Sequence, residues 1–293
     1  MQISISSRIA VRDTSIYDCA RAGINIGDGC WGGHLIEHCD VFDTVLETHD
    51  HGSFNSWGRD RYWAGNHRGA SEPEVKKDAK LPYLDAMQAI VLRDSRWRCD
   101  HGWDIDLDDG SSNYEIYNNL LLRGGLKFRE GYGRRAWNNI LVNSGFHPHV
   151  WFDDSASEFR TNIVMAAHAP IGQPAGWGKL VDRNLFASEA DRRKHLNSGG
   201  DANSISGDPM FVNPAAGDFR VKEGSPAFKI GFRNFPMDQF GVKKPSLKAL
   251  ARTPVIPELK VPAGGGQRES IAQTLFWLGA SLHSLQGDRK SVV

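Results

Sequence analysis

The chain has 293 residues, enough for one or two domains with a hydrophobic core. Its 35 Lys and Arg residues balance 35 Asp and Glu residues, so no basic field is available to attract nucleic acid or an anionic membrane. No apolar run is long enough to span a bilayer, and residues 1–15 lack the basic start and apolar run of a secretion signal. We therefore expect no nucleic-acid or membrane partner, and we expect any export signal to lie outside this chain.

A repeated polar marker organises most of the chain. An Asp or Asn at the start of a strand-like segment recurs at Asp13, Asp40, Asp94, Asn119, Asn139, Asn162, Asn184 and Asp208. Successive markers are 20 to 27 residues apart, apart from one separation of 54. One turn of a parallel β-solenoid needs about this many residues, and stacked Asn or Asp side chains satisfy backbone groups at its bends. The repeat predicts an all-β, parallel β-helix.

The separation of 54 residues predicts one further turn and a long inserted loop. Residues 44–49 (TVLETH) alternate like a strand, whereas residues 50–89 are irregular. This insertion contains Trp57, Arg59 and Asp60, and loops of such length in compact folds are usually functional or disordered. We expect the loop to bind sugar or to cover a site. A loop packed down by its own aromatic side chains is the alternative.

Alternation along the predicted strands separates an inner face from an outer one. The residues predicted to lie inside are Ile24, Ile26, Ile105, Leu107, Leu126, Phe128, Val150 and Phe152. The residues predicted to point outward are Glu47, His49, Asp104, Asp106, Asp108, Lys127, Arg129, His149, Trp151 and Asp153, with Asp109, Glu130 and Asp154 just beyond the strand ends. Neighbouring turns lie about 4.8 Å apart, so these residues predict one continuous charged face. An ordinary solvated surface is the alternative.

The C-terminal part carries a family resemblance. Gly207-Asp208-Pro209-Met210-Phe211-Val212, Gly217-Asp218-Phe219-Arg220-Val221 and Gly224-Ser225-Pro226-Ala227 resemble the ending of bacterial right-handed parallel β-helix proteins of the pectate-lyase superfamily. With the repeats, the resemblance covers residues 1–232. Residues 233–269 are rich in Pro and Gly and are expected to form a tail or linker. Residues 270–293 are expected to form a short amphipathic helix, and Trp277-Leu278-Gly279-Ala280 resembles the start of a truncated PDZ-like module.

A second resemblance concerns the charged face. Glycoside hydrolysis needs one carboxylic acid to protonate the leaving oxygen and a second carboxylate that attacks or activates water. The strand end at Asp108 and the Phe128-Arg129-Glu130 strand end one turn later resemble the Asp and Glu pair of β-helical glycoside hydrolases, families 120 and 141 among them. The resemblance implies Asp108 as nucleophile or base and Glu130 as acid. Asp106 and Asp109 are alternative counterparts of the Asp.

Other chemistries suit the same residues. β-Elimination of a uronate polysaccharide needs a base, here Lys127 or Arg129, and often Ca²⁺ held by several Asp side chains, here the row from Asp104 to Asp108. The pairs His49-Asp50-His51 and His147-Pro148-His149 have metal-ligand types, but two turns separate them by about 10 Å. We therefore expect no metal for hydrolysis, and calcium only for a lyase. A non-catalytic carbohydrate-binding solenoid is the remaining alternative.

Taken together, the residues favour a bacterial, secreted or periplasmic glycosidase acting on plant or algal polysaccharide or its oligosaccharides. Asp108, Glu130, Asp109 and Asp106 are the predicted catalytic carboxylates. The side chains predicted to hold the carbohydrate are His49, Trp57, Arg59, Asp60, His101, Arg129, His149, Trp151 and Asp153.

Overall fold

A computed structural model describes residues 1–27, 31–58, 72–172, 177–260, 275–277 and 280–282. The chain divides into two units, residues 1–262 and 263–293, and each is described by itself. The predicted insertion residues Arg59 and Asp60 lie outside the described residues. No helix of the described chain is both long and apolar enough to cross a membrane.

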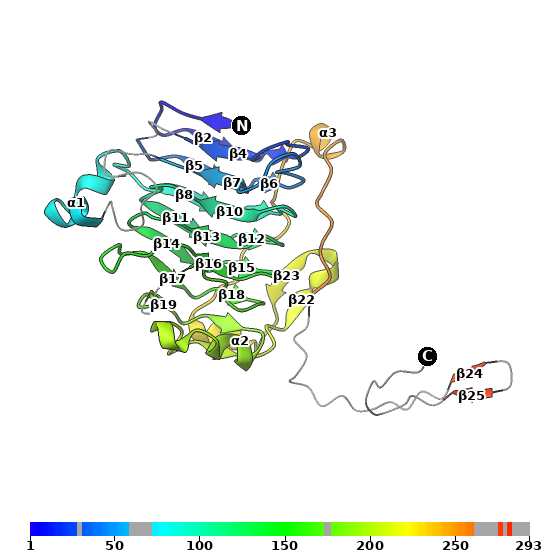
Figure 1. Cartoon of the computed structure of the whole chain (residues 1–293). Helices are drawn as coiled ribbons and strands as arrows, with labels where there is room; N and C mark the ends of the chain where they lie inside the picture. The colour runs from blue at the N-terminus through cyan, green and yellow to red at the C-terminus, as the bar shows by residue number, and fades with distance from the viewer. Residues whose placement is uncertain (28–30, 59–71, 173–176, 261–274, 278–279, 283–293) are drawn as a thin grey trace, which may run out of the picture. The chain divides into compact units, whose positions relative to one another are not determined.

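Three sheets of short parallel strands build the first unit (Figure 1). Sheet 1 contains β1 (Gln2–Ile3), β4 (Ile24–Ile26), β7 (Gly52–Ser56), β10 (Trp103–Leu107), β13 (Leu126–Phe128) and β16 (Phe146–Pro148). Sheet 2 contains β2 (Ala10–Arg12), β5 (Leu35–Glu37), β8 (Ile90–Arg93), β11 (Tyr114–Tyr117), β14 (Arg134–Trp137), β17 (Glu158–Arg160) and β19 (Val181–Asp182). Sheet 3 contains β3 (Ser15–Ile16), β6 (Asp40–Val41), β9 (Arg96–Trp97), β12 (Leu120–Leu121), β15 (Ile140–Leu141), β18 (Ile163–Val164), β20 (Leu185–Phe186) and β21 (Ile205–Ser206).

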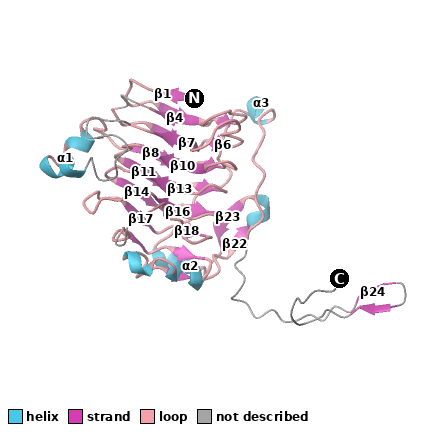
Figure 2. Cartoon of the chain, viewed as in Figure 1, coloured by secondary structure: helices cyan, strands magenta, loops and turns pink. Residues whose placement is uncertain are grey.

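Each of the first six turns contributes a strand to each sheet, the last turns contribute only to sheets 2 and 3, and each turn pairs with the turn before it, which makes a β-solenoid of about eight turns. The predicted parallel β-helix is confirmed. Helical segments lie outside the stack of strands (Figure 2). They are α1 (Glu72–Lys77), η1 (Leu81–Tyr83), α2 (Glu189–Arg193), η2 (Leu196–Ser198), η3 (Pro214–Ala216), η4 (Pro226–Ile230) and α3 (Pro245–Lys248).

Apolar side chains stacked at equivalent positions form the core. One row of sheet 1 runs through Ile24, Phe54, Ile105, Leu126 and Phe146, each fully buried and paired in register with the next. Six of the predicted inner residues are confirmed in this core, namely Ile24, Ile26, Ile105, Leu107, Leu126 and Phe128. The other two, Val150 and Phe152, are buried instead in a separate cluster with Val75 and Tyr132. They follow β16, so the strand alternation assumed for them does not apply.

A ladder of buried Asn side chains holds successive turns in register. The backbone N–H and the Nδ2 of Asn119 donate to Oδ1 of Asn139, at 3.0 and 3.1 Å, and Asn139 donates in the same way to Asn162, at 3.0 and 3.0 Å. Asn184 continues the ladder. All four side chains are fully buried. The ladder therefore supplies partners for backbone groups that the bend between sheets 2 and 3 would leave unpaired.

Asn119 and Asn139 are each preceded by another Asn, and the two members of each pair have separate structural roles. The first Asn of each pair adopts a left-handed conformation, with φ of 55° at Asn118 and 54° at Asn138. Asn tolerates this region better than most residues, which permits the sharp bend. The second Asn of each pair, Asn119 or Asn139, points inward and forms the ladder.

The segment after residue 207 covers an apolar stripe on the outside of sheet 3. It begins with an antiparallel hairpin, β22 (Phe211–Asn213) and β23 (Asp218–Val221). Phe211, Phe219 and Phe235 pack with the outward residues Leu120 and Ile140. Further along, Ile256 and Leu259 contact the same cluster. The predicted linker from residue 233 is therefore wrong as far as residue 260, because this apolar stripe needs a cover.

Two further boundaries differ from the prediction. Residues 44–49 form no strand; the sheet 1 strand of this turn is β7, and the insertion begins after it rather than at residue 50. In the second unit, β24 (Leu275–Trp277) and β25 (Ala280–Leu282) pair antiparallel. The predicted helix over residues 270–293 is therefore wrong at these positions, and the remainder of that stretch lies outside the described residues.

We expect Asn139→Ala to lower the free energy of unfolding by about 2 kcal/mol or more, because it leaves the buried N–H of Asn119 and C=O of Ile116 unpaired. Urea denaturation measures the change. Asn203→Ala is the matched control, because Asn203 is exposed and its Nδ2 donates to Asp182 at the surface. Equal effects of the two substitutions would contradict a structural role for the ladder.

Candidate active site

A row of polar side chains crosses sheet 1 on its outer side. Asn25, Asn55, Asp106, Lys127 and His147 are successive register partners, and each follows a core residue of its own strand. Asn55 Nδ2 donates to Asn25 Oδ1 at 3.0 Å. The first four are nonetheless buried, with exposed fractions of 4, 1, 0 and 1%. This part of the outer face is therefore a packed polar layer and not a solvated row of charges.

Lys127 is the central cation of this layer. Its Nζ lies 3.1 Å from Asp106 Oδ1, 3.3 Å from Asp108 Oδ1 and 3.7 Å from Asp50 Oδ1. The Nζ also lies 4.0 Å from the ring centroid of Trp103. Burial lowers the pKa of Lys127, but the three carboxylates outweigh burial and raise it overall. Lys127 is therefore protonated at neutral pH.

The predicted acidic row of sheet 1 divides into three different roles. Asp104 accepts hydrogen bonds from the backbone N–H groups of Cys99, Arg123 and Gly125, at 2.7 to 3.1 Å, so it holds the bend before β10. Asp106 is fully buried beneath Lys127, and burial raises its pKa to about 8. Asp108 follows β10 and its side chain is 19% exposed. Of the three, Asp108 alone is open to a ligand.

Three carboxylates meet at the guanidinium of Arg129. Arg129 Nε lies 3.5 Å from Asp108 Oδ1, and Arg129 Nη1 lies 2.9 Å from Glu130 Oε1 and also contacts Asp109. The buried Arg134 donates to the backbone oxygen of Arg129 and holds this turn. The structure thus brings the predicted Asp108, Asp109 and Glu130 together.

A hollow of about 340 Å³ opens beside this cluster, and we call it the acid hollow. Its lining residues are Arg21, Asp50, His51, Asn55, Trp57, Asp108 and Asp109. His51 contacts Arg21 Nε at 2.9 Å. Burial, followed by the charge of Arg21, lowers the pKa of His51, so its imidazole is neutral near pH 7. The hollow therefore offers a neutral imidazole, an amide, an indole and carboxylates to one ligand.

Several predicted sugar ligands lie elsewhere. Trp151 is half-buried and packs against Phe146 and Trp177, with ring centroids 6.2 and 6.4 Å apart, so it belongs to the core and not to the outer row. His149 follows β16, and its N–H donates to Phe128 O. The remaining predicted ligands His49, His101 and Asp153 are exposed. Asp154 is exposed too, and it does not line the acid hollow.

The sequence did not indicate Asn55 or Arg21, and it pointed to Asp50 and His51 only as part of the pair His49-Asp50-His51, weighed there as a metal or hydroxyl ligand. The error came from placing the strand at residues 44–49, which put Glu47 and His49 in the row that Asn55 occupies. A usable signal was present. The triplets Ile24-Asn25-Ile26, Ile105-Asp106-Leu107 and Leu126-Lys127-Phe128 each set one polar residue between two apolar ones, and Phe54-Asn55 begins the same pattern.

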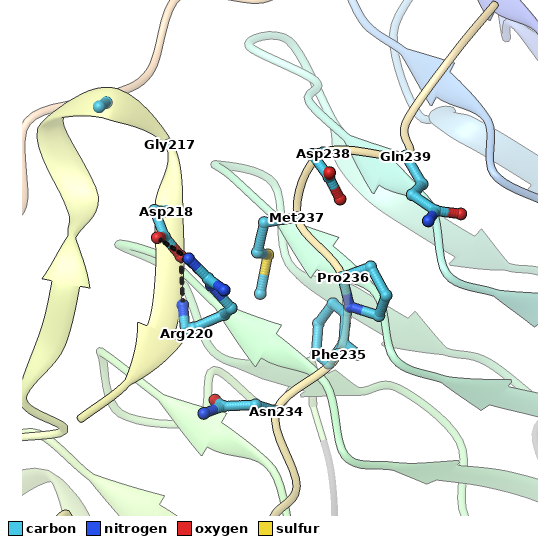
Figure 3. A pocket seen from close by; sticks show the side chains of 10 residues that line it. Gly217, Asp218, Arg220, Asn234, Phe235, Pro236, Met237, Asp238 and Gln239 are labelled. Carbon is cyan, nitrogen blue, oxygen red and sulfur yellow. Dashed lines mark hydrogen bonds and ion pairs between the residues drawn. The ribbon is translucent and has the colours of Figure 1, made fainter. Parts of the chain in front are cut away.

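A larger hollow, of about 620 Å³, lies away from sheet 1 (Figure 3). It is formed by β23 and residues 234–239, with Phe235, Pro236 and Met237 on one side. Its Arg220 binds both carboxylate oxygens of Asp218, at 2.9 and 2.6 Å. Arg220 and Asp218 there are already paired with each other, and size alone does not favour this hollow over the carboxylate cluster.

Within the described residues, no group of three or more His, Cys, Asp or Glu side chains is arranged to hold a metal ion. The two His-x-His pairs have other neighbours. His51 contacts Arg21, and burial lowers the pKa of His147 to about 4. Comparison with protein families, with curated proteins and with solved structures finds no match to this chain. The geometry of sheet 1 therefore carries the functional argument.

Asp106 makes a specific prediction about pH. Its pKa is about 8 in the folded chain against 3.8 for a free side chain, so the folded state binds this proton more tightly. Its contribution to stability is present below pH 4 and is lost as the pH rises towards 8. In the wild type we expect Asp106 to make the free energy of unfolding fall by up to about 1.4 kcal/mol per pH unit over this window. We expect Asp106→Asn to abolish this fall.

Urea denaturation across the pH range measures this difference between the wild type and Asp106→Asn. Asp153→Asn is the control, because Asp153 is exposed and should leave the profile unchanged. Parallel pH profiles for wild type and Asp106→Asn would show that Asp106 is ionised in the folded chain throughout.

Proposed function

We propose that the protein is a glycoside hydrolase, secreted or periplasmic, that cleaves glycosidic bonds of a plant or algal polysaccharide or its oligosaccharides. The observation that carries the proposal is the convergence of Asp108, Asp109 and Glu130 on Arg129, with Asp108 and Asp109 also lining the acid hollow. Hydrolysis of an acetal needs two carboxyl groups on either side of one bond, and this cluster provides them from adjacent turns. The resemblance to β-helical glycoside hydrolases selects the same residues.

In this proposal Asp108 is the nucleophile or the base. Lys127 and Arg129 both face its carboxylate, at 3.3 and 3.5 Å, and hold it in one orientation. Asp106 cannot touch substrate because it is fully buried, so it positions Lys127. Glu130 gives its proton to the leaving oxygen while Asp108 attacks the anomeric carbon or takes a proton from the attacking water.

The environment of Glu130 differs from that of Asp108. Glu130 shares Arg129 with Asp109, so one guanidinium faces two carboxyl groups. We assign the role of general acid to Glu130 and leave Asp109 in the ion pair with Arg129.

The acid hollow also fits a sugar ring. Asn55 is 1% exposed, and its Oδ1 has no hydrogen-bond partner within the described part of the chain. Because Asn55 is as buried as Lys127, its amide adds polarity to the wall of the hollow and is not proposed as a direct contact of a sugar hydroxyl. Trp57 adds an aromatic surface to the same hollow.

Lyase chemistry is the less favoured alternative. A lyase base removes a proton from carbon and must itself be unprotonated before the step. Asp106, Asp108 and Asp50 raise the pKa of Lys127, which keeps the proton on its amine. Lys127 is also buried at 1% exposure, so a polymer does not reach it directly.

We expect Asp108→Asn and Glu130→Gln each to lower turnover by about 100-fold or more, because each removes one of the two carboxyl groups. Release of reducing ends from xylan, pectin, arabinan and fucosylated oligosaccharides measures turnover. Glu115→Gln is the matched control on sheet 2, where Glu115 pairs with Arg135 at the surface. Near-normal activity in either variant would remove that residue from its role.

The same assay separates the competing functions. A hydrolase releases reducing ends without ultraviolet absorbance from an unsaturated product, and its activity survives EDTA. Unsaturated product that disappears on chelation would replace the proposal with a calcium-dependent lyase. Binding of sugar without any product would replace it with a carbohydrate-binding solenoid.

A further inference from the structure

A second hollow lies on the same outer face of sheet 1. It measures about 500 Å³, and we call it the Trp103 hollow. Its lining includes Trp103, His101, Arg123, Asn143, His147 and Asp50. These residues lie at or before the starts of β7, β10 and β13 and around β16. The acid hollow extends further along the strands, from His51 before β7 to Asn55 and Asp108 near the ends of β7 and β10.

Asp50 joins the two hollows, because it lines both of them. Its carboxylate lies 3.7 Å from Lys127 Nζ, which lies 3.3 Å from Asp108 Oδ1. The Lys127 ammonium group thus lies between Asp108, the proposed nucleophile, and Asp50, which borders the Trp103 hollow. A ligand that continues past the acid hollow across Asp50 enters the Trp103 hollow.

The lining of the Trp103 hollow has the groups that hold a sugar ring. Trp103 is half-buried, and Lys127 and His147 fix its indole, with Lys127 Nζ 4.0 Å from the ring centroid and the His147 ring edge-on at 6.5 Å. Asp100 is held by Arg98 and Arg123, at 3.0 and 3.0 Å. A rigid aromatic surface with fixed planar polar groups at its rim suits the apolar face and the hydroxyls of a sugar.

We propose that the Trp103 hollow is a second sugar-binding subsite, so that the substrate is an oligosaccharide or polysaccharide that occupies both hollows across Asp50. The proposal rests on the proposed function for the identity of the acid hollow as the first subsite. It assigns Trp103 as the residue against which the neighbouring sugar stacks. A single sugar fills the acid hollow alone and gains nothing from Trp103.

The test measures binding in the full chain carrying Glu130→Gln, so that cleavage does not consume the ligand. The probes are the monosaccharide, disaccharide and trisaccharide of xylose, arabinose and galacturonic acid, and calorimetry gives each affinity. In one of these series we expect the disaccharide to bind about 10-fold more tightly than the monosaccharide. Adding Trp103→Ala should abolish this gain, and Trp103→Phe should restore most of it because an aromatic ring returns.

Trp31→Ala is the matched control, because Trp31 is 37% exposed and lies outside both hollows. Equal affinity for one and two sugar units, or a length dependence that survives Trp103→Ala, would overturn the subsite. Binding in none of the series would overturn it too. Length-dependent binding in a chain whose unmutated form releases no product would retain the subsite and reject hydrolysis, so the two failures are distinguishable.

Discussion

Register between successive turns is the constraint on which the rest of this structure depends. Asn119, Asn139, Asn162 and Asn184 each tie one turn to the next through buried hydrogen bonds. A shift of one residue in any turn would exchange the inner and outer faces of its strands. The ladder therefore does more than stabilise a bend, because it fixes which side chains of sheet 1 point towards the hollows.

The candidate site uses this register to concentrate charge that no single strand could hold. Asp106 and Lys127 are direct partners on β10 and β13, and each lies between two core residues of its own strand. Burial of the pair costs free energy, which the structure offsets by adding Asp108, Asp50 and the Trp103 ring around one ammonium group. The buried pair therefore supports the carboxylates that contact Arg129, of which Asp108 is the most exposed.

Much of this arrangement followed from the sequence. The marker spacing gave the solenoid and most of the inner residues, and a separation of 22 residues, about one turn, between Asp108 and Glu130 brought them to one guanidinium. The errors at Glu47, His49 and Asn55 share one cause, since residues 44–49 resemble a strand locally and Gly52–Ser56 does not. Pairing with β4 and β10 overrides that preference. The Pro-rich composition of residues 233–260 likewise concealed their packing on sheet 3, because the apolar stripe they cover belongs to residues far away in the sequence.

The C-terminal segment has a further consequence for how the solenoid folds. Stacked turns contact only their neighbours, so a solenoid can in principle lose turns one at a time from either end. Here Gly241 N–H donates to His38 O, Lys243 pairs with Asp13, and Arg252 pairs with Asp18, all in the first turns, while Phe235 packs against the later turns. The segment thus connects both ends of the solenoid. Unfolding of the first turn therefore also releases the segment that packs against the later turns. Such a strap converts a nearly one-dimensional array into a single cooperative unit.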